Sequence, residues 1–195
     1  MNVPKKGIGF VLAGTVLMLS ALSLFLYNQY EDARAGQEAE NLQAIILQSI
    51  PETQPAEKAK ALTPQMPVKE IDGYGYVGYL SIPDLELELP VMSEWDYNRL
   101  KIAPCRQFGS SRTDDLVIAA HNYKNHFAGL EQLEVGAPVS FTDMEGIENQ
   151  YKVALVALLA PTEVEAVQNS EHDLVLYTCT YNGKTRIVVF CDRSE

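Results

Sequence analysis

A cysteine, an arginine and a histidine are the residue types in this sequence that together could perform nucleophilic chemistry. Cys179 ends one apolar run, Asn182-Gly183 follows, and a second apolar run begins near Arg186. Asn-Gly between two apolar segments predicts a β-hairpin with a two-residue type I′ turn. That register places Cys179 directly opposite Arg186, with their Cβ atoms roughly 5 Å apart on one face. It places Cys191 on the opposite face.

The predicted pairing of a thiol with a guanidinium has a functional and a structural interpretation. A guanidinium beside Cys179 favours the thiolate, which is the nucleophilic form. The donors of Arg186 also suit a developing oxyanion. In the structural interpretation, Cys179 is a small half-buried residue and Arg186 is its surface neighbour. The hairpin alone favours the structural interpretation, so a base elsewhere in the chain is needed to support catalysis.

Three histidines could pair with the thiol. His121 directly follows the apolar run LVIAA, at the tip of a predicted strand, from where it could project into a cleft. His126 lies in the segment that follows, and His172 lies in an acidic loop. A loop position among acids is typical of a solvated histidine, whereas a strand fixes His121 in one place. A thiol, His121 and Arg186 at neighbouring strand ends would form a site for acyl transfer.

Composition limits the class of protein. The chain has 195 residues, of which 15 are basic and 26 acidic, giving a formal net charge of -11. This balance argues against nucleic-acid binding, which requires a cationic surface. The cysteines Cys105, Cys179 and Cys191 have no zinc-type spacing. Because the number of cysteines is odd, at least one thiol is free. The other two could be free as well, or Cys105 and Cys191 could form a disulfide.

Residues 7–30 carry no charge, and about 20 apolar residues are enough to cross a bilayer. Lys5 and Lys6 precede this stretch, and Glu31 and Asp32 follow it. The positive-inside rule then predicts a single-pass anchor with a cytoplasmic N-terminus and everything beyond residue 30 outside the cell. A cleaved signal peptide is the alternative. It is disfavoured because the cleavage-like Ala-Arg-Ala sequence lies far beyond the apolar stretch.

Three regions are predicted along the chain. Residues 1–30 form a cytoplasmic tip and the transmembrane anchor. Residues 31–70 form an extracellular stalk that contains a probable helix at 37–49, which Pro51 would end. Residues 71–195 form the functional domain.

The pattern of residues 71–195 is mainly β. Short apolar and β-branched runs are separated by Pro, Gly, Asn and Asp, which suggests an all-β barrel or sandwich. Two short helices are expected at 93–102 and 126–133. The predicted strands occupy residues 74–82, 85–91, 116–120, 139–143, 151–159, 174–180 and 185–191.

With these residues in place, the chain resembles a sortase, a cysteine transpeptidase of Gram-positive cell surfaces. Sortases carry a T-L-x-T-C signature, an arginine on the next strand and a histidine at an earlier strand end. Here residues 175–179 read VLYTC, Arg186 follows, and His121 lies within the sequence AHN. Residues 78–91, GYLSIPDLELELPV, resemble the opening strands of the family. Val175 replaces the first threonine of the signature, and Ala120 stands where a glycine often precedes the histidine.

The resemblance implies a sortase-like eight-stranded β-barrel with short helices, preceded by the transmembrane helix. It implies that Cys179, His121 and Arg186 are catalytic, and that Thr178 contacts the substrate. The substrate would be an LPxTG-like sorting signal of a secreted protein, which becomes a thioacyl-enzyme and is transferred to an amine of a cell-wall precursor or a pilin. No cofactor is implied, and no nucleic acid is a partner.

Alternatives to the transpeptidase remain at this point. Without a good amine acceptor, the same residues would act as a cysteine peptidase that hydrolyses the signal. A membrane-anchored binding module with a structural Cys179 would catalyse nothing. The acidic segment 160–173 could bind calcium through Glu163, Glu165, Glu171 and Asp173, as in some sortases, or it could be a solvated loop.

Overall fold

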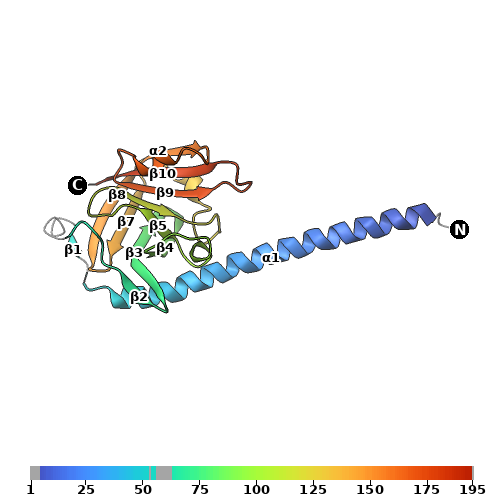
Figure 1. Cartoon of the computed structure of the whole chain (residues 1–195), viewed down its shortest axis with the longest axis horizontal. Helices are drawn as coiled ribbons and strands as arrows, with labels where there is room; N and C mark the ends of the chain where they lie inside the picture. Colours follow the sequence, from blue (N-terminus) through green and yellow to red (C-terminus); the bar gives the residue numbers. More distant parts are fainter. Residues whose placement is uncertain (1–4, 53, 56–62, 195) are drawn as a thin grey trace. The chain divides into compact units, whose positions relative to one another are not determined.

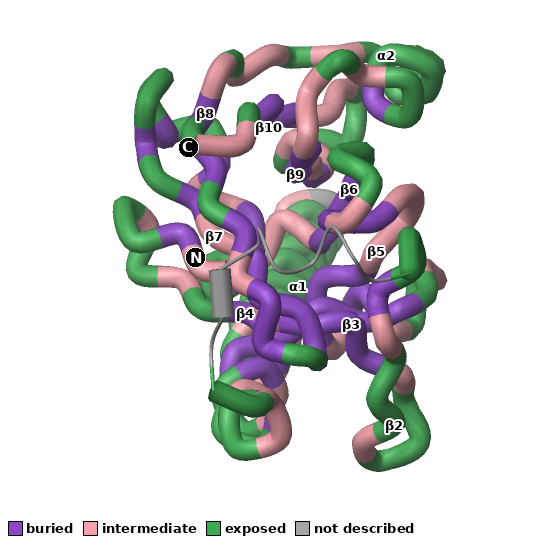
Figure 2. Tube along the Cα trace, turned by 90° about the vertical axis from the view of Figure 1, so that its left-hand side faces the viewer, coloured by how far each residue is buried: buried purple, intermediate pink, exposed green. Residues whose placement is uncertain are grey.

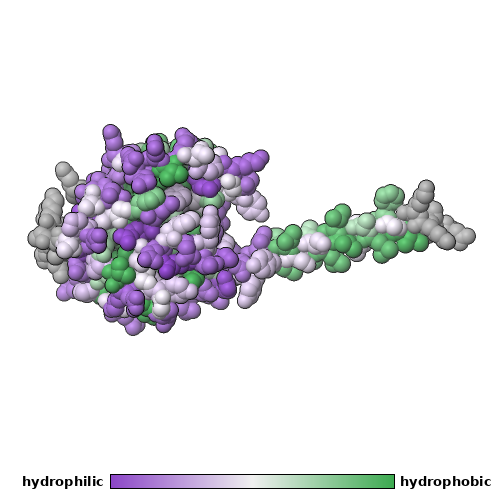
Figure 3. Space-filling model, viewed as in Figure 1, coloured by the Kyte–Doolittle hydropathy of each residue, from purple (hydrophilic) through white to green (hydrophobic). Residues whose placement is uncertain are grey.

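The structure is a computed structural model that describes residues 5–52, 54–55 and 63–194. It divides into two compact units, Met1–Arg34 and Ala35–Glu195, and a single helix, α1 (Lys5–Ser49), belongs partly to each. The apolar part of α1, taken from Gly7, is long and apolar enough to span a membrane. Figure 3 shows the apolar residues along its N-terminal portion. This helix is the candidate for the predicted anchor.

The second unit is built around a closed eight-stranded β-barrel, as predicted (Figure 1). Hydrogen bonding runs in the order β3-β4-β5-β6-β9-β10-β8-β7, and β7 pairs with β3 to close the barrel. The pairs β4–β5 and β6–β9 are parallel. The strands are β3 (Tyr74–Ile82), β4 (Leu87–Met92), β5 (Cys105–Phe108), β6 (Leu116–Ala119), β7 (Pro138–Asp143), β8 (Ile147–Leu159), β9 (Leu174–Cys179) and β10 (Arg186–Arg193).

Two short strands extend the sheet beyond the barrel. β1 (Gln54–Pro55) pairs in parallel with β8, and β2 (Lys69–Ile71) pairs with β3. In the described parts of the chain, the remaining helical segments are α2 (Val164–Gln168), η2 (Pro83–Leu85), η3 (Arg99–Lys101) and η4 (Leu130–Gln132).

Alternation along the strands divides the buried apolar residues between the barrel interior and its outer face. Figure 2 shows the burial of each residue along the chain. On β9, Leu174 and Leu176 belong to the main core, whereas Val175 belongs to a cluster on the other face. On β10, Cys191 belongs to the interior core and lies on the face opposite Arg186, as predicted. Because side chains alternate with period two, Cys179 shares the outer face with Val175.

Several sequence predictions need correction at the level of local structure. The helix predicted at 93–102 is only η3. In the turn before it, the carboxylate of Asp96 accepts hydrogen bonds from the N–H groups of Asn98 and Arg99 at 2.7 and 3.0 Å. The helix predicted at 126–133 is only η4. Strand β5 was not predicted, because its sequence CRQF has little apolar character.

The C-terminal portion of α1 packs on the barrel. Ala35, Ala39 and Ile46 are at most 2% exposed. Ala39 joins the main core, and Ile46 joins a second cluster that also contains Tyr76. The compact unit that contains the barrel therefore begins at Ala35, well before residue 71, because this part of α1 uses its apolar stripe to cover the barrel.

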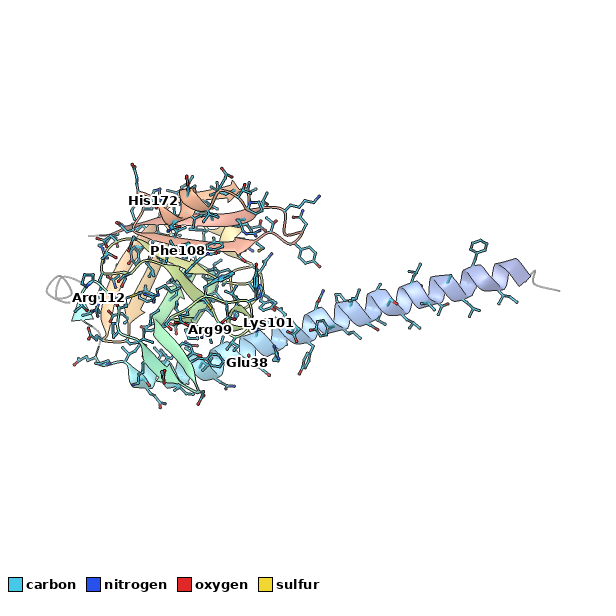
Figure 4. The ribbon with its side chains drawn as sticks, viewed as in Figure 1. Glu38, Arg99, Lys101, Phe108, Arg112 and His172 are labelled. Atoms are coloured by element: carbon cyan, nitrogen blue, oxygen red, sulfur yellow. The ribbon has the colours of Figure 1, made fainter. Side chains whose placement is uncertain are left out.

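A buried ion pair holds the segment before β2 in place. The guanidinium of Arg112, labelled in Figure 4, pairs with the fully buried carboxylate of Asp143 at 2.7 Å. Its Nη1 also donates hydrogen bonds to the carbonyls of Thr63 and Gln65 at 3.4 and 3.3 Å. Arg112 thus joins the backbone shortly before β2 to Asp143 on β7 of the barrel.

Candidate active site

The hairpin of β9 and β10 has the register that the sequence predicts, with a different turn. Cys179 is the direct partner of Arg186. The N–H of Thr180 donates to the carbonyl of Thr185 at 3.0 Å, which leaves a four-residue connection, 181–184. Gly183 has a φ of 69°, but Asn182 is not among the described non-glycine residues with a positive φ. A type I′ turn needs positive φ at both positions, so that prediction was wrong.

His121 follows β6, which lies beside β9 on the side away from β10. The two strands are parallel, with Ala119 paired with Tyr177. The N–H of Ala120 donates to the carbonyl of Tyr177 at 3.2 Å. Continuing this register by two residues brings His121 level with Cys179. The ends of three adjacent strands, whose backbones lie about 4.8 Å apart, therefore carry Arg186, Cys179 and, two residues beyond β6, His121, and we call these three residues the row.

Burial distinguishes Cys179 from the other two cysteines. All three are free thiols, so the alternative of a Cys105–Cys191 disulfide is excluded. Cys105 and Cys191 are fully buried, and desolvation raises the pKa of each thiol to about 12. Cys179 is partly exposed on the outer face. It is thus the cysteine that a substrate in solution can reach.

The guanidinium of Arg186 contacts the turn beside Cys179. Its Nη1 donates hydrogen bonds to the carbonyls of Gly183 and Thr185, at 3.2 and 3.1 Å. None of the hydrogen bonds among the described residues joins it to the sulfur of Cys179. These contacts hold the arginine at the row and leave its other N–H groups available, since a guanidinium has five donors.

His121 is half-buried, and its environment favours the neutral imidazole. Burial lowers the pKa of His121, and the positive charge of Lys101 (Figure 4) acts in the same direction. Its ring packs against Tyr123, with the ring centroids 5.1 Å apart. An imidazole can accept a proton in one step of a reaction and give it up in another, as general acid–base chemistry requires.

The other two histidines lie elsewhere. His172, labelled in Figure 4, places its Nδ1 2.6 Å from a carboxylate oxygen of Asp192 and packs against Phe190 at the surface. His126 is completely buried, and neither ring nitrogen has a hydrogen-bond partner. Burial lowers the pKa of His126 to about 4, and the charge of His121 adds to the effect.

Thr178 joins the strands that carry the thiol and the imidazole. Its side chain is 1% exposed, and its hydroxyl donates a hydrogen bond to the carbonyl of Ala120 at 2.9 Å. Because the side chain is buried and already bonded, any contact of Thr178 with a substrate must come from its backbone.

Sequence reasoning missed Tyr177 and Gln107, which shape the surface beside the row. Tyr177 lies on the same face of β9 as Cys179, and its hydroxyl donates a hydrogen bond to the side chain of Gln107 on β5. Between these two strands lies the small side chain of Ala119 on β6. The phenol ring therefore spans β6. Alternation along β9 could have identified Tyr177, but Gln107 lies on the strand that was not predicted.

The acidic segment between β8 and β9 offers no support for a calcium site. The carboxylate of Glu163 accepts a hydrogen bond from the N–H of Ala160 at 2.5 Å, and that of Asp173 accepts one from the N–H of Arg193 at 2.6 Å. Within the described part of the chain, no group of three or more His, Cys, Asp or Glu side chains could hold a metal ion.

Comparison with known proteins assigns the family. The family model of the sortase domain matches residues 80–194. No curated protein matches the chain at a significant level. Similar solved structures include sortase C1 from Streptococcus suis, which is 23% identical, has a TM-score of 0.55 and covers 62% of this chain and 73% of its own. Sortase C from Clostridium perfringens is 21% identical, with a TM-score of 0.55 and coverages of 82% and 90%.

Sortase A from Corynebacterium diphtheriae is 15% identical, with a TM-score of 0.57, and covers 89% of this chain and 96% of its own. At these identities the structural likeness supports the fold, and the sortase-domain match supports the family. The chain belongs to the sortase family. Sortases are in general cysteine transpeptidases of Gram-positive cell walls that act on sorting signals and use amine nucleophiles.

Proposed function

We propose that this protein is a membrane-anchored transpeptidase that cleaves an LPxTG-like sorting signal and transfers the protein to an amine of a cell-wall precursor or a pilin. The observation that carries the proposal is the row formed by His121, Cys179 and Arg186 on adjacent strand ends. A partly exposed thiol flanked by an imidazole and a guanidinium has the three groups that thiol acyl transfer needs.

In the first half-reaction, the thiol of Cys179 gives its proton to His121, and the thiolate sulfur attacks the carbonyl carbon that precedes the final glycine of the signal. The guanidinium of Arg186 stabilises the oxyanion with donors that the turn carbonyls leave free. The C–N bond breaks as His121 gives its proton to the departing amine nitrogen, and a thioester remains on the enzyme.

In the second half-reaction, an acceptor amine attacks the thioester. His121 takes the proton from the attacking nitrogen, the C–S bond breaks, and Cys179 is regenerated. Dividing one difficult step into two easier ones is the advantage of covalent catalysis. Thr178 supports both steps by holding the Ala120 carbonyl next to His121, and its backbone borders the bound peptide.

Membrane topology completes the proposal. Lys5 and Lys6 precede the uncharged stretch, and acidic residues follow it. The positive-inside rule then places the N-terminus in the cytoplasm and the barrel outside the cell, with one membrane crossing. This orientation would present the row of catalytic residues to secreted proteins.

The test uses the full-length protein in detergent, a library of sorting-signal peptides and several amines, with products read by mass spectrometry. A thioester on Cys179 and a ligated product with triglycine are expected. Cleavage without ligation at any triglycine concentration would instead indicate a peptidase. Peptide binding without a thioester would indicate a binding module.

Substitutions of Cys179 and Arg186 test their proposed roles in the reaction. Cys179→Ala should form no thioester. Arg186→Ala should lower kcat by about 10²–10³, the usual cost of losing one oxyanion donor. Lys184→Ala is the control, because this cation is exposed in the same connection and has no role in the proposed chemistry. Equal rates for the Arg186 and Lys184 variants would contradict the role of the arginine.

A further inference from the structure

We infer that the segment of α1 beginning at Ala35 positions the catalytic imidazole, and that Gly36 and His126 are the positioning residues through which it acts. The inference rests on the proposed function, because it concerns His121 as the proton donor of that reaction. It also extends the catalytic unit beyond the sortase domain, whose match covers residues 80–194 only.

The first observation is a close approach between α1 and the segment that follows His121. A Cβ atom added at Gly36 would lie 3.0 Å from Cγ and 3.2 Å from Cβ of Asn125, and closer still to its Nδ2. The preceding residue of the helix, Ala35, is only 1% exposed. A larger side chain at position 36 would therefore have to displace Asn125.

The second observation is a buried imidazole at the same contact. His126 adjoins Asn125, is completely buried, and has no hydrogen-bond partner for either ring nitrogen. A weak hydrogen-bond interaction with the backbone of Ala35 partly opposes the lowering of its pKa, which places α1 against the ring. A buried polar group without a hydrogen bond of good geometry is costly and usually has a reason beyond packing.

The third observation connects this contact to His121. The ring of Tyr123 lies between the two histidines, with centroid distances of 5.1 Å to His121 and 5.5 Å to His126. The N–H of Phe127 donates to the carbonyl of His121 at 3.3 Å, and the N–H of His126 donates to that of Tyr123 at 3.0 Å. The segment 121–127 thus forms a compact turn, so a shift at Asn125 or His126 moves the imidazole of His121.

The chemical consequence is confined to proton transfer. Breaking the scissile C–N bond requires a proton from His121 at the leaving nitrogen. A thioester of the same peptide carries a leaving thiolate, which departs without being protonated. Displacing His121 should therefore slow formation of the thioacyl-enzyme from the amide and leave its formation from the thioester unaffected, whereas general damage to the barrel would slow both. The later attack of the acceptor amine also uses His121 but is common to the two substrates, so a single turnover separates the two effects.

The test measures single-turnover release of the amine from the amide and of the thiol from the thioester by full-length Gly36→Ala and Gly36→Leu in detergent, with active sites counted by alkylation of Cys179. The controls are Gly14→Ala and Gly14→Leu on the same helix, because nothing lies within 4 Å of a Cβ at that position. Gly36→Leu should lower amide kcat by about 10- to 100-fold, the order expected for a misplaced catalytic group. Gly36→Ala should lower it less.

Asn125→Gly combined with Gly36→Leu should restore part of the amide rate, because it opens the space that the new side chain needs. If Gly36→Leu fails to fold, Gly36→Ala decides the question, since alanine favours a helix more than glycine and any loss of amide rate cannot come from a weaker helix. Unchanged amide rates in both variants, or equal losses on amide and thioester, would overturn the inference. No cleavage of either substrate by the wild type would instead refute the proposed function.

Discussion

At the residue scale, burial decides which of three chemically identical thiols can react. Cys105 and Cys191 are fully buried, and desolvation raises their pKa values to about 12. Cys179 is partly exposed at the end of β9, beside a guanidinium. The thiolate is the reactive form, so access and charge act together at this residue alone.

Brief treatment of the folded protein with iodoacetamide should therefore modify Cys179 first. Peptide mapping by mass spectrometry at early times would measure the order of labelling, and the same treatment in denaturant provides the control in which all three thiols react. Equal early labelling of the three cysteines in the folded protein would contradict the assignment of the nucleophile.

The pKa of His121, the proposed proton donor, depends on a neighbouring cation. Burial lowers the pKa of His121, and the charge of Lys101 lowers it further. Activity that requires the imidazolium falls as pH rises through the pKa of His121. Lys101→Gln should raise this pKa and move the falling limb of the pH–kcat profile to higher pH. The difference between the falling limbs of the wild type and Lys101→Gln should become smaller in concentrated salt, because salt screens the charge of Lys101 in the wild type. If Lys101→Gln leaves the falling limb of the pH–kcat profile unmoved at low salt, Lys101 does not lower the pKa of His121.

At the element scale, the predicted register of the β9–β10 hairpin was correct although the predicted turn type was wrong. The closing pair, Thr180 and Thr185, fixes Cys179 opposite Arg186 whether the connection has two residues or four. Here Gly183 alone takes the left-handed conformation. The even number of residues between the strands preserves the face on which each side chain lies, and that face is what the chemistry uses.

The segment 121–130 is expected to make the protein sensitive to acid through His126. Its pKa is about 4 in the folded chain against 6.5 as the ordinary value. Between these values the unfolded state binds more protons, so stability falls as pH decreases from 6.5 to 4, by at most on the order of 3 kcal/mol.

Denaturant unfolding of wild type and His126→Phe at pH 7 and pH 5 would measure this loss. Phenylalanine keeps an aromatic ring but cannot take up a proton, so the pH dependence should be weaker in the variant. An equal loss of stability in both proteins would show that other groups cause the acid sensitivity.

At the scale of the whole molecule, the barrel unit includes part of the helix that carries the candidate membrane span. Ile46 is fully buried against a cluster that contains Tyr76, and Leu42 and Ile50 pack on the same cluster. A truncation chosen from the family match alone, or from the predicted stalk, would uncover this surface.

A chain that begins at residue 52 should therefore be less stable than one that begins at Ala35. The loss should be at least that of Ile46→Ala, for which about 2–5 kcal/mol is typical of a fully buried isoleucine. Thermal unfolding of the two truncated chains, compared with Ile46→Ala in the longer one, would measure it. Equal melting temperatures for the two lengths would show that α1 adds nothing to the barrel.

The sequence by itself determined what local patterns control. The uncharged stretch 7–30, most of the barrel strands and the pairing of Cys179 with Arg186 follow from composition, alternation and a short connection. Only the tertiary structure decided what distant segments do together. Thr178 and Ala120 are joined by a hydrogen bond across 58 residues of sequence, which holds the end of β6, just before His121, against β9. The tertiary structure also decided three other features: strand β5, the position of Tyr177 across β6, and the packing of Ala35 near His126. None of them could be predicted, because pairing between two remote segments leaves no periodic pattern in the sequence of either segment.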